Sequence, residues 1–244
     1  MPSVDQAFFD KLASVYHGQN PDWPWYVYAA LVFQINDKMD LVGETWRAAH
    51  DRAQDQDKQF LVARKLREGL LKASVLVGFP LGINALTTLR QHIKHAAPHL
   101  EDRLDQDKSL RSSLQRPEKD KRGKEFFTAV YAQHTDKVLH NMSVASGGDL
   151  SEFAINAVYG DLMAETSRLD MKETTLLEFV ACYASAGSVG VQAKSHMYGC
   201  HNVGNTRAEI LAAVEICRLV EAQLGVVKGR REEEYRWLAK AEGW

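Results

Sequence analysis

Residues 174–210 read TTLLEFVACYASAGSVGVQAKSHMYGCHNVGNTRAEI and say most about the fold. The long apolar run predicts a buried helix that ends near Gly187. A second helix follows and carries His196. The segment 202–204, Asn-Val-Gly, predicts the end of that second helix, because asparagine and glycine favour a turn at a helix C-terminus.

Two capping boxes mark where helices begin around this stretch. Asp170 is followed three residues later by Glu173, and Thr206 by Glu209. In this motif the first side chain accepts a hydrogen bond from a free helix amide and the acid reaches back. We therefore expect helices to begin directly after Asp170 and directly after Thr206.

Helical periodicity continues through the rest of the 244 residues, and the alternation typical of strands is nearly absent. We therefore predict an all-α fold. Between residues 96 and 123 the sequence becomes charged, poor in large apolar side chains and interrupted by two prolines. Such mixed charge indicates a solvated segment. The expected organisation is an N-terminal half over residues 1–97, a charged linker over 98–122 and a C-terminal half over 123–244.

Charge and hydropathy favour some partners over others. The formal charge is -2 and basic residues are interspersed with acids, so we expect no nucleic-acid partner. No apolar run approaches the roughly 20 residues of a membrane-spanning helix, so we expect no membrane partner. The acidic N-terminal region and the Gly-Trp C-terminus resemble neither a transit peptide nor a Ser-Lys-Leu address. We expect a cytoplasmic protein, with mitochondrial and peroxisomal locations left open.

The helical pair with its histidine and glycine-containing turn resembles the carboxymuconolactone decarboxylase and alkylhydroperoxidase-D (AhpD) superfamily. The segment YGDLMAETSRLD at 159–170 is also similar to that superfamily, and Arg67-Glu68 resembles its Arg-Glu-Leu signature. The resemblance covers most of residues 25–95 and 122–225. It implies an AhpD-like fold in two diverged copies, and a homo-oligomer. Superposing Gly78 on Gly187 places Thr87 opposite His196, which is the alignment expected of an internal duplication.

The peroxidase branch of this superfamily carries a C-x-x-C pair just upstream of the histidine. The positions seven and four residues before His196 are Val189 and Gln192. The sequence therefore argues against C-x-x-C peroxidase chemistry.

His196 is the first candidate catalytic residue, because histidine can act as a general acid or base near neutral pH. A core histidine bonded to a backbone group is the alternative. The resemblance implies a glutamate partner 19 residues earlier, where this chain has Leu177; Glu178 is its neighbour. Glu68 in the first half is the other candidate. It could instead form helical ion pairs with the basic residues around it.

Cys200 lies four residues after His196 and shares a helical face with it, which could lower the pKa of the thiol and create a nucleophile. A buried, inert cysteine is the alternative. Cys182 and Cys217 are not spaced as resolving partners in the superfamily's manner. We find no second closely spaced ligand pair for a structural metal and no nucleotide-binding motif, so we expect no metal and no cofactor.

These observations favour a cofactor-free acid–base enzyme, a decarboxylase, lyase or isomerase, that acts on a small organic acid or lactone. His196 would transfer the proton, with Glu178 or Glu68 as its orienting carboxylate. Two alternatives stay open. One is a non-catalytic oligomeric or small-molecule-binding protein, and the other is a residual thiol-dependent peroxidase that uses Cys200.

Overall fold

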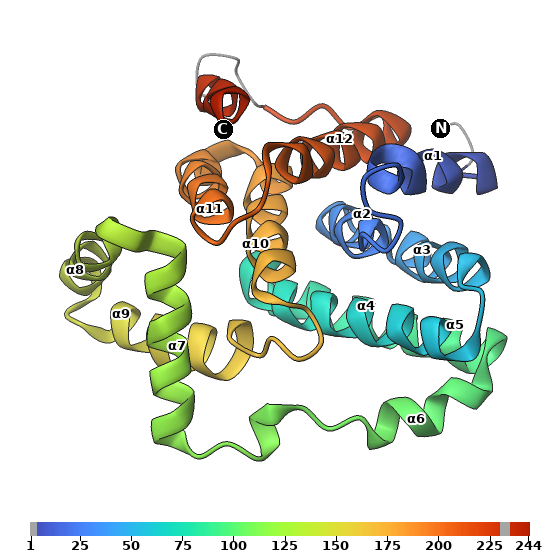
Figure 1. Ribbon diagram of the computed structural model, residues 1–244, viewed down its shortest axis with the longest axis horizontal. Coiled ribbons are helices and arrows are strands. Elements are labelled where there is room, and N and C mark those ends of the chain that lie inside the picture. The colour runs from blue at the N-terminus through green and yellow to red at the C-terminus, as the bar shows by residue number, and fades with distance from the viewer. Residues whose placement is uncertain (1–3, 230–234) are drawn as a thin grey trace.

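The computed structural model describes residues 4–229 and 235–244, and that part of the chain contains helices and no strand (Figure 1). The predicted all-α class is confirmed. The α-helices are α1 (Gln6–His17), α2 (Trp25–Ile35), α3 (Met39–Arg52), α4 (Gln56–Val77), α5 (Phe79–Ala96), α6 (Glu101–Gln106), α7 (Arg116–Tyr131), α8 (Thr135–Ser146), α9 (Asp149–Phe153), α10 (Met171–Ser185), α11 (Gly190–Asn202) and α12 (Arg207–Leu224). Short 3-10 turns complete the described chain at η1 (Pro98–Leu100), η2 (Leu110–Ser112), η3 (Ala132–His134), η5 (Gly187–Val189) and η6 (Arg236–Gly243), and η4 (Ala154–Met163) is a π-helix.

Helix α10 is the central element, and it contacts α2, α4, α11 and α12 (Figure 1). Its apolar residues reach almost all the way around the helix, so most of them are buried. They join one large core built from α1 to α5 and α10 to α12. The two sequence regions expected as separate halves therefore share this core, whereas the expected duplication remains a prediction.

A second, smaller core lies between α7 and η4, and its largest members are Phe126, Phe127 and Tyr159. The two helices approach very closely at a pair of glycines. A Cβ atom added to Gly123 would lie 2.6 Å from the Cα atom of Gly160. Because this contact is between backbones, no side-chain rotation could relieve it. The glycines therefore allow α7 to lie directly against η4.

Both capping boxes form as predicted. The Asp170 carboxylate accepts a hydrogen bond from the Glu173 amide at 2.7 Å, and the Thr206 hydroxyl accepts one from the Glu209 amide at 3.2 Å. Both acids also reach back to the cap amides. The two predicted helix starts are confirmed, and they fix α10 and α12 on either side of α11.

The charged segment contains more structure than the sequence suggests. It holds η1, α6 and η2 and crosses below the core between α5 and α7 (Figure 1). Helix α7 already begins at Arg116, inside the expected linker, with Pro117 in its first turn. Proline is tolerated there, because the first amides of a helix have no partner within the helix. A capping box between Gln115 and Glu118 adds to the signal.

Candidate functional site

His196 and Glu178 face each other across the α10–α11 contact. The Nδ1 atom of His196 lies 3.5 Å from the Oε2 atom of Glu178. The two residues are 6% and 1% exposed, so the pair is nearly sealed from water. Among the described residues neither of these two atoms has a hydrogen-bond partner. The exposed remainder of the imidazole lies away from Nδ1, since that atom is itself buried.

The turn between the two helices decides which acid meets the histidine. Glu178 lies 18 residues before His196, and Leu177, at the 19-residue spacing, packs into the apolar core. The connection passes through Ala186, whose φ of +58° is in the left-handed region that side chains other than glycine rarely adopt. Such strain persists where the surrounding structure fixes the backbone, and it is often found at functional sites.

Two tyrosines that the sequence does not single out complete this site. The ring centroid of Tyr131, at the end of α7, lies 6.1 Å from that of His196. The Tyr159 hydroxyl, on η4, lies beside the Glu178 carboxylate and beside the Tyr131 hydroxyl. Burial and the charge of Glu178 raise the pKa of both phenols well above its usual range. Both tyrosines are therefore protonated at neutral pH and able to donate hydrogen bonds.

Helix α11 holds the end of α7 in place. The Asn202 side-chain amide donates a hydrogen bond to the Val130 carbonyl at 2.8 Å. Gly199 lets the helices approach, because a Cβ there would lie 2.7 Å from a Val130 methyl group. The next residue after Tyr131 is Ala132, with φ of +47°. These contacts fix the position of Tyr131 beside His196.

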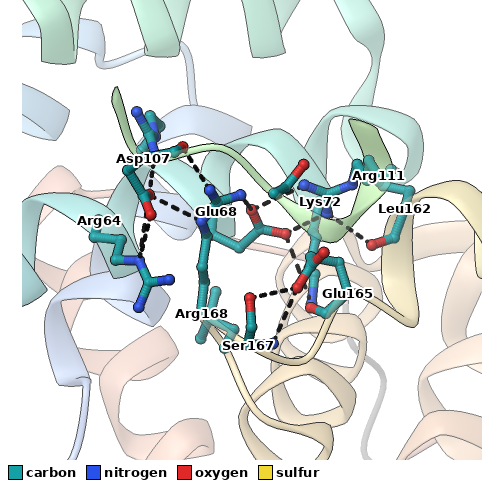
Figure 2. Close-up of polar contacts among 12 residues, drawn as sticks. Arg64, Glu68, Lys72, Asp107, Arg111, Leu162, Glu165, Ser167 and Arg168 are labelled. Carbon is teal, nitrogen blue, oxygen red and sulfur yellow. Dashed lines mark hydrogen bonds and ion pairs between the residues drawn. The ribbon is translucent and has the colours of Figure 1, made fainter. Parts of the chain in front are cut away.

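Glu68, on α4, occupies a different place, in an ionic cluster with Arg111 of the charged segment and Arg168 of the loop before α10 (Figure 2). Both terminal nitrogens of Arg111 donate to its carboxylate. Arg168 lies 3.7 Å from the same carboxylate, and Lys72 lies 3.8 Å from it. The ion pair between Glu68 and Lys72, four residues apart on α4, is thus present. The structure pairs Glu178 with His196 and pairs Glu68 with cations.

Lys72 connects this cluster to the His196–Glu178 pair. Its ammonium is fully buried and donates to the Glu165 carbonyl and to the Thr174 hydroxyl, each at 2.7 Å. Burial lowers the pKa of Lys72 to about 8, although the charges of Glu68, Glu178 and Glu165 act in the opposite direction. A lysine held this way is the one cation in the cluster whose charge is close to changing at physiological pH.

The remaining ionic contacts hold the charged segment 97–115 against the core. Asp107 receives hydrogen bonds from Arg64, Arg67 and Arg168 (Figure 2). Burial alone would raise the pKa of Asp107, but these arginines hold it below its usual range. The charged segment is mostly exposed, as expected of a solvated linker, but it also supplies the partly buried Asp107 and Arg111 to this cluster. The sequence does not indicate these contacts, because the partners of the two residues lie far away in the chain.

The cysteines lie in surroundings that disfavour a thiolate. All three are in the described part of the chain and are free thiols. Burial raises the pKa of Cys200 well above its usual range, and its thiol lies 3.4 Å from the Thr175 carbonyl. Burial and the charge of Glu178 raise the pKa of Cys182 to about 12. Cys217 is buried in the main core. The thiol of Cys200 is therefore protonated and inaccessible, which matches the inert alternative.

Two pockets open on the surface away from this pair. One of about 650 Å³ lies between Trp23, Arg52 and Lys58, and another of about 560 Å³ lies beside His201 and Trp244. Neither is lined by His196 or Glu178. Within 4–229 and 235–244 no three histidine, cysteine, aspartate or glutamate side chains are grouped to hold a metal ion. No helix in the described chain is long and apolar enough to cross a membrane.

Replacing Lys72 with methionine tests the buried ammonium. In the unfolded chain a lysine keeps its proton up to about pH 10.4, whereas in the folded protein Lys72 loses it near pH 8. Between these values the unfolded state binds more protons, so the Lys72 contribution to the free energy of unfolding rises with pH. Chemical denaturation should show the wild type gaining stability over Lys72→Met as the pH rises from 8 to 10. Lys94→Met, on an exposed side chain of α5, is the matched control. Equal pH trends in the two variants would contradict the assignment.

Comparison with known proteins gives a family but no activity. No family model matches the chain, and no solved structure matches it. The chain is 30% identical over 162 residues to Peroxisomal protein 2 of Schizosaccharomyces pombe, a match that covers 66% of this chain and 71% of that protein. It is 26% identical over 179 residues to Peroxisomal protein 2 of Saccharomyces cerevisiae, covering 66% of this chain and 62% of that protein. The chain therefore belongs to the family of the yeast proteins named Peroxisomal protein 2.

Proposed function

We propose that this chain is a cofactor-free acid–base enzyme, a decarboxylase, lyase or isomerase, that acts on a small organic acid or lactone. The observation that carries the proposal is the buried pair of His196 and Glu178, with 3.5 Å between Nδ1 and Oε2. A histidine oriented by a carboxylate is the usual arrangement of a general base. The resemblance to carboxymuconolactone decarboxylases supports the same chemistry.

The roles of the two residues follow from the side of the ring that each nitrogen faces. In the proposed reaction the two side chains close the 3.5 Å between them, and Glu178 accepts a hydrogen bond from Nδ1–H, which selects the tautomer with a lone pair on Nε2. Nε2 then removes a proton from a carbon next to a carbonyl group, and the imidazole becomes positively charged. The Glu178 carboxylate stabilises that charge, as the buried aspartate does in catalytic triads. Returning the proton to another atom of the substrate completes an isomerisation or a lyase step.

The buried cluster lies next to this arrangement, because Thr174, which accepts a hydrogen bond from Lys72, is four residues before Glu178 on α10. The Lys72 ammonium attracts the Glu178 carboxylate as well as Glu68. Removing water from a charged pair strengthens its interactions but makes any unpaired charge costly. The buried Lys72 ammonium is therefore an opposite charge placed within reach of the Glu178 carboxylate.

The alternatives have weaker support. A thiol-dependent peroxidase needs a thiolate, and the surroundings of Cys200 and Cys182 oppose one. A non-catalytic binding protein is compatible with the pocket of about 650 Å³ near Trp23, but that pocket leaves the His196–Glu178 pair without a role.

Solvent deuterium exchange tests the acid–base proposal even where the product is unidentified. The protein is incubated in D₂O with a panel of oxo acids and lactones, and proton NMR detects the loss of C–H signals. We expect exchange on at least one compound, abolished in His196→Gln and reduced about 10²- to 10⁴-fold in Glu178→Gln. His140→Gln, on the exposed face of α8, should keep full activity.

Circular dichroism provides the check on folding for these variants. A histidine with only a structural role would lower the melting temperature of His196→Gln, and any exchange would persist in the folded fraction. Exchange that is equal in His196→Gln and wild type would reject the proposal.

We also propose that the protein acts in peroxisomes. The support is the name of the two yeast relatives, which describes them as peroxisomal. The sequence by itself favours the cytoplasm and leaves peroxisomes open. Antibody imaging of the untagged protein in the cells that make it should show overlap with catalase. Diffuse cytoplasmic staining would reject this location.

We propose further that the chain is a homo-oligomer that associates through the α4–α5 corner. Phe79 and Ile83 lie four residues apart on α5 and are 64% and 52% exposed, and Val75, near the end of α4, is 43% exposed. Exposed large apolar side chains that gather in one region are typical of interaction surfaces. Sedimentation velocity should show a dimer or larger species that dissociates in Phe79→Asp/Ile83→Asp. Thr87→Asp, exposed one turn further along α5, is the control. A monomeric wild type would contradict the proposal.

A further inference from the structure

Acid–base chemistry by His196 and Glu178 alone leaves Tyr131 and Tyr159 without a role, although both lie at that pair. Tyr159 is 5% exposed and is surrounded by the smaller core, whereas Tyr131 is only partly buried. Their hydroxyls contact each other, and that of Tyr159 also contacts Glu178. A row of hydrogen-bonding groups thus runs from the surface side of the site to the buried carboxylate.

Counting protons shows which hydroxyl is free to donate. A phenol hydroxyl has one proton to donate and can also accept, whereas an ionised carboxylate only accepts. The Tyr159 hydroxyl has one proton to offer, and it lies between the Glu178 carboxylate and the Tyr131 oxygen, so the Tyr131 proton is committed to neither of them. Tyr131 is therefore the outermost donor, and its proton is the one that a substrate atom can claim without breaking the bond to Glu178.

Packing holds the Tyr131 ring in a single place. The ring packs against Phe127 with centroids 4.4 Å apart and the rings inclined by 36°, and Phe127 in turn contacts Tyr159 edge-on at 4.9 Å. The Gly123–Gly160 contact joins the two helices that carry these tyrosines. A donor fixed in advance in a site with little water is the arrangement that stabilises a developing negative charge most effectively.

We propose that Tyr131 is a catalytic residue that donates a hydrogen bond to an oxyanion formed on the substrate, which makes the substrate a carbonyl compound that passes through an enolate. This inference rests on the proposed function. His196 Nε2 takes the proton from the carbon next to the carbonyl group, and the C–H electron pair moves onto the carbonyl oxygen. Tyr131 donates a hydrogen bond to that oxygen and keeps its proton. Reprotonation of carbon then restores the carbonyl group, so atoms and charges balance.

The positions of the two side chains fit one small substrate. The ring centroids of Tyr131 and His196 are 6.1 Å apart and the rings are inclined by 59°. A separation of this size lets the two groups act on one small molecule, and in the proposed reaction the histidine takes the carbon acid and the phenol binds the adjacent oxygen. Burial keeps the phenol protonated, so it acts as a donor over the whole neutral pH range.

Binding of 4-nitrophenolate tests the oxyanion site, because this stable anion presents a phenolate oxygen and its visible absorption changes when that oxygen accepts a hydrogen bond. We expect saturable binding to the wild type with a shifted absorption band. Tyr131→Phe should bind about tenfold more weakly or worse, since a hydrogen bond to a charged group is lost. Tyr16→Phe is the matched control, as its ring lies in α1 against Trp23. Melting curves check that Tyr131→Phe, which retains the stacked ring, remains folded.

The outcomes separate this inference from the acid–base proposal, because probe binding requires no turnover. Binding that depends on Tyr131 supports the oxyanion site, even if deuterium exchange proves independent of His196. Equal binding by Tyr131→Phe and wild type, or no saturable binding by the wild type, overturns it whatever the exchange experiment shows.

Discussion

Neutralisation of the buried Glu68 carboxylate is the constraint on which much of the architecture depends. An ionised carboxylate in the interior costs roughly several kcal/mol unless cations and hydrogen bonds compensate it. Here the compensation comes from α4 itself through Lys72, from the charged segment through Arg111, and from the loop before α10 through Arg168. Three separate parts of the chain must converge on one side chain. That convergence fixes the path of residues 97–115 beneath the core and brings α7 to the side of α10 where the candidate site lies (Figure 1).

Helix α10 serves the core and the site at the same time. One turn of this helix buries Leu177 in apolar contacts and presents Glu178 to His196. Because the helix is covered on nearly every side, a polar group on it must have a specific partner. Each polar residue on the central part of α10 has one. Thr174 meets Lys72, Thr175 bonds to the preceding turn, and Glu178 meets His196 and Tyr159. The contacts of the candidate site therefore also provide the partners that allow the polar residues of α10 to be buried.

The fold class and several boundaries could be predicted from sequence because their causes are local. The capping boxes at Asp170 and Thr206 involve residues three apart, so their geometry is fixed by the spacing alone. The choice between Leu177 and Glu178 could not be made, because it depends on the strained turn at Ala186. Arg111 was unpredictable for another reason. The residues around Arg111 are charged and polar, as in a solvated segment, and its partner Glu68 lies 43 residues earlier in the sequence.

The two tyrosines of the site also could not be predicted, because their contacts join residues that are distant in the sequence. Tyr131 and Tyr159 reach Glu178 from two helices that are brought together by Gly123 and Gly160. The segment 159–170 resembles a known superfamily, but the resemblance does not indicate the direction in which the Tyr159 side chain points. Lys72 was likewise visible only as one of several basic residues on α4. Its complete burial depends on Glu165 and Thr174, which the sequence places about a hundred residues away.

The π-helical geometry of η4 gives the length of this segment a meaning of its own. A π-helix closes its hydrogen bonds one residue later than an α-helix, so each turn holds an additional residue. In an α-helix each residue turns the chain by about 100°, so removing one residue would rotate everything on one side of the change by that amount. Tyr159 lies within η4 between two anchors, the Ile155 carbonyl, which lies against Gly123, and the Asp161 carbonyl, which accepts a hydrogen bond from Arg111. The number of residues between those anchors therefore determines the direction in which the Tyr159 side chain points. Relatives that differ by one residue here would place a different side chain next to Glu178.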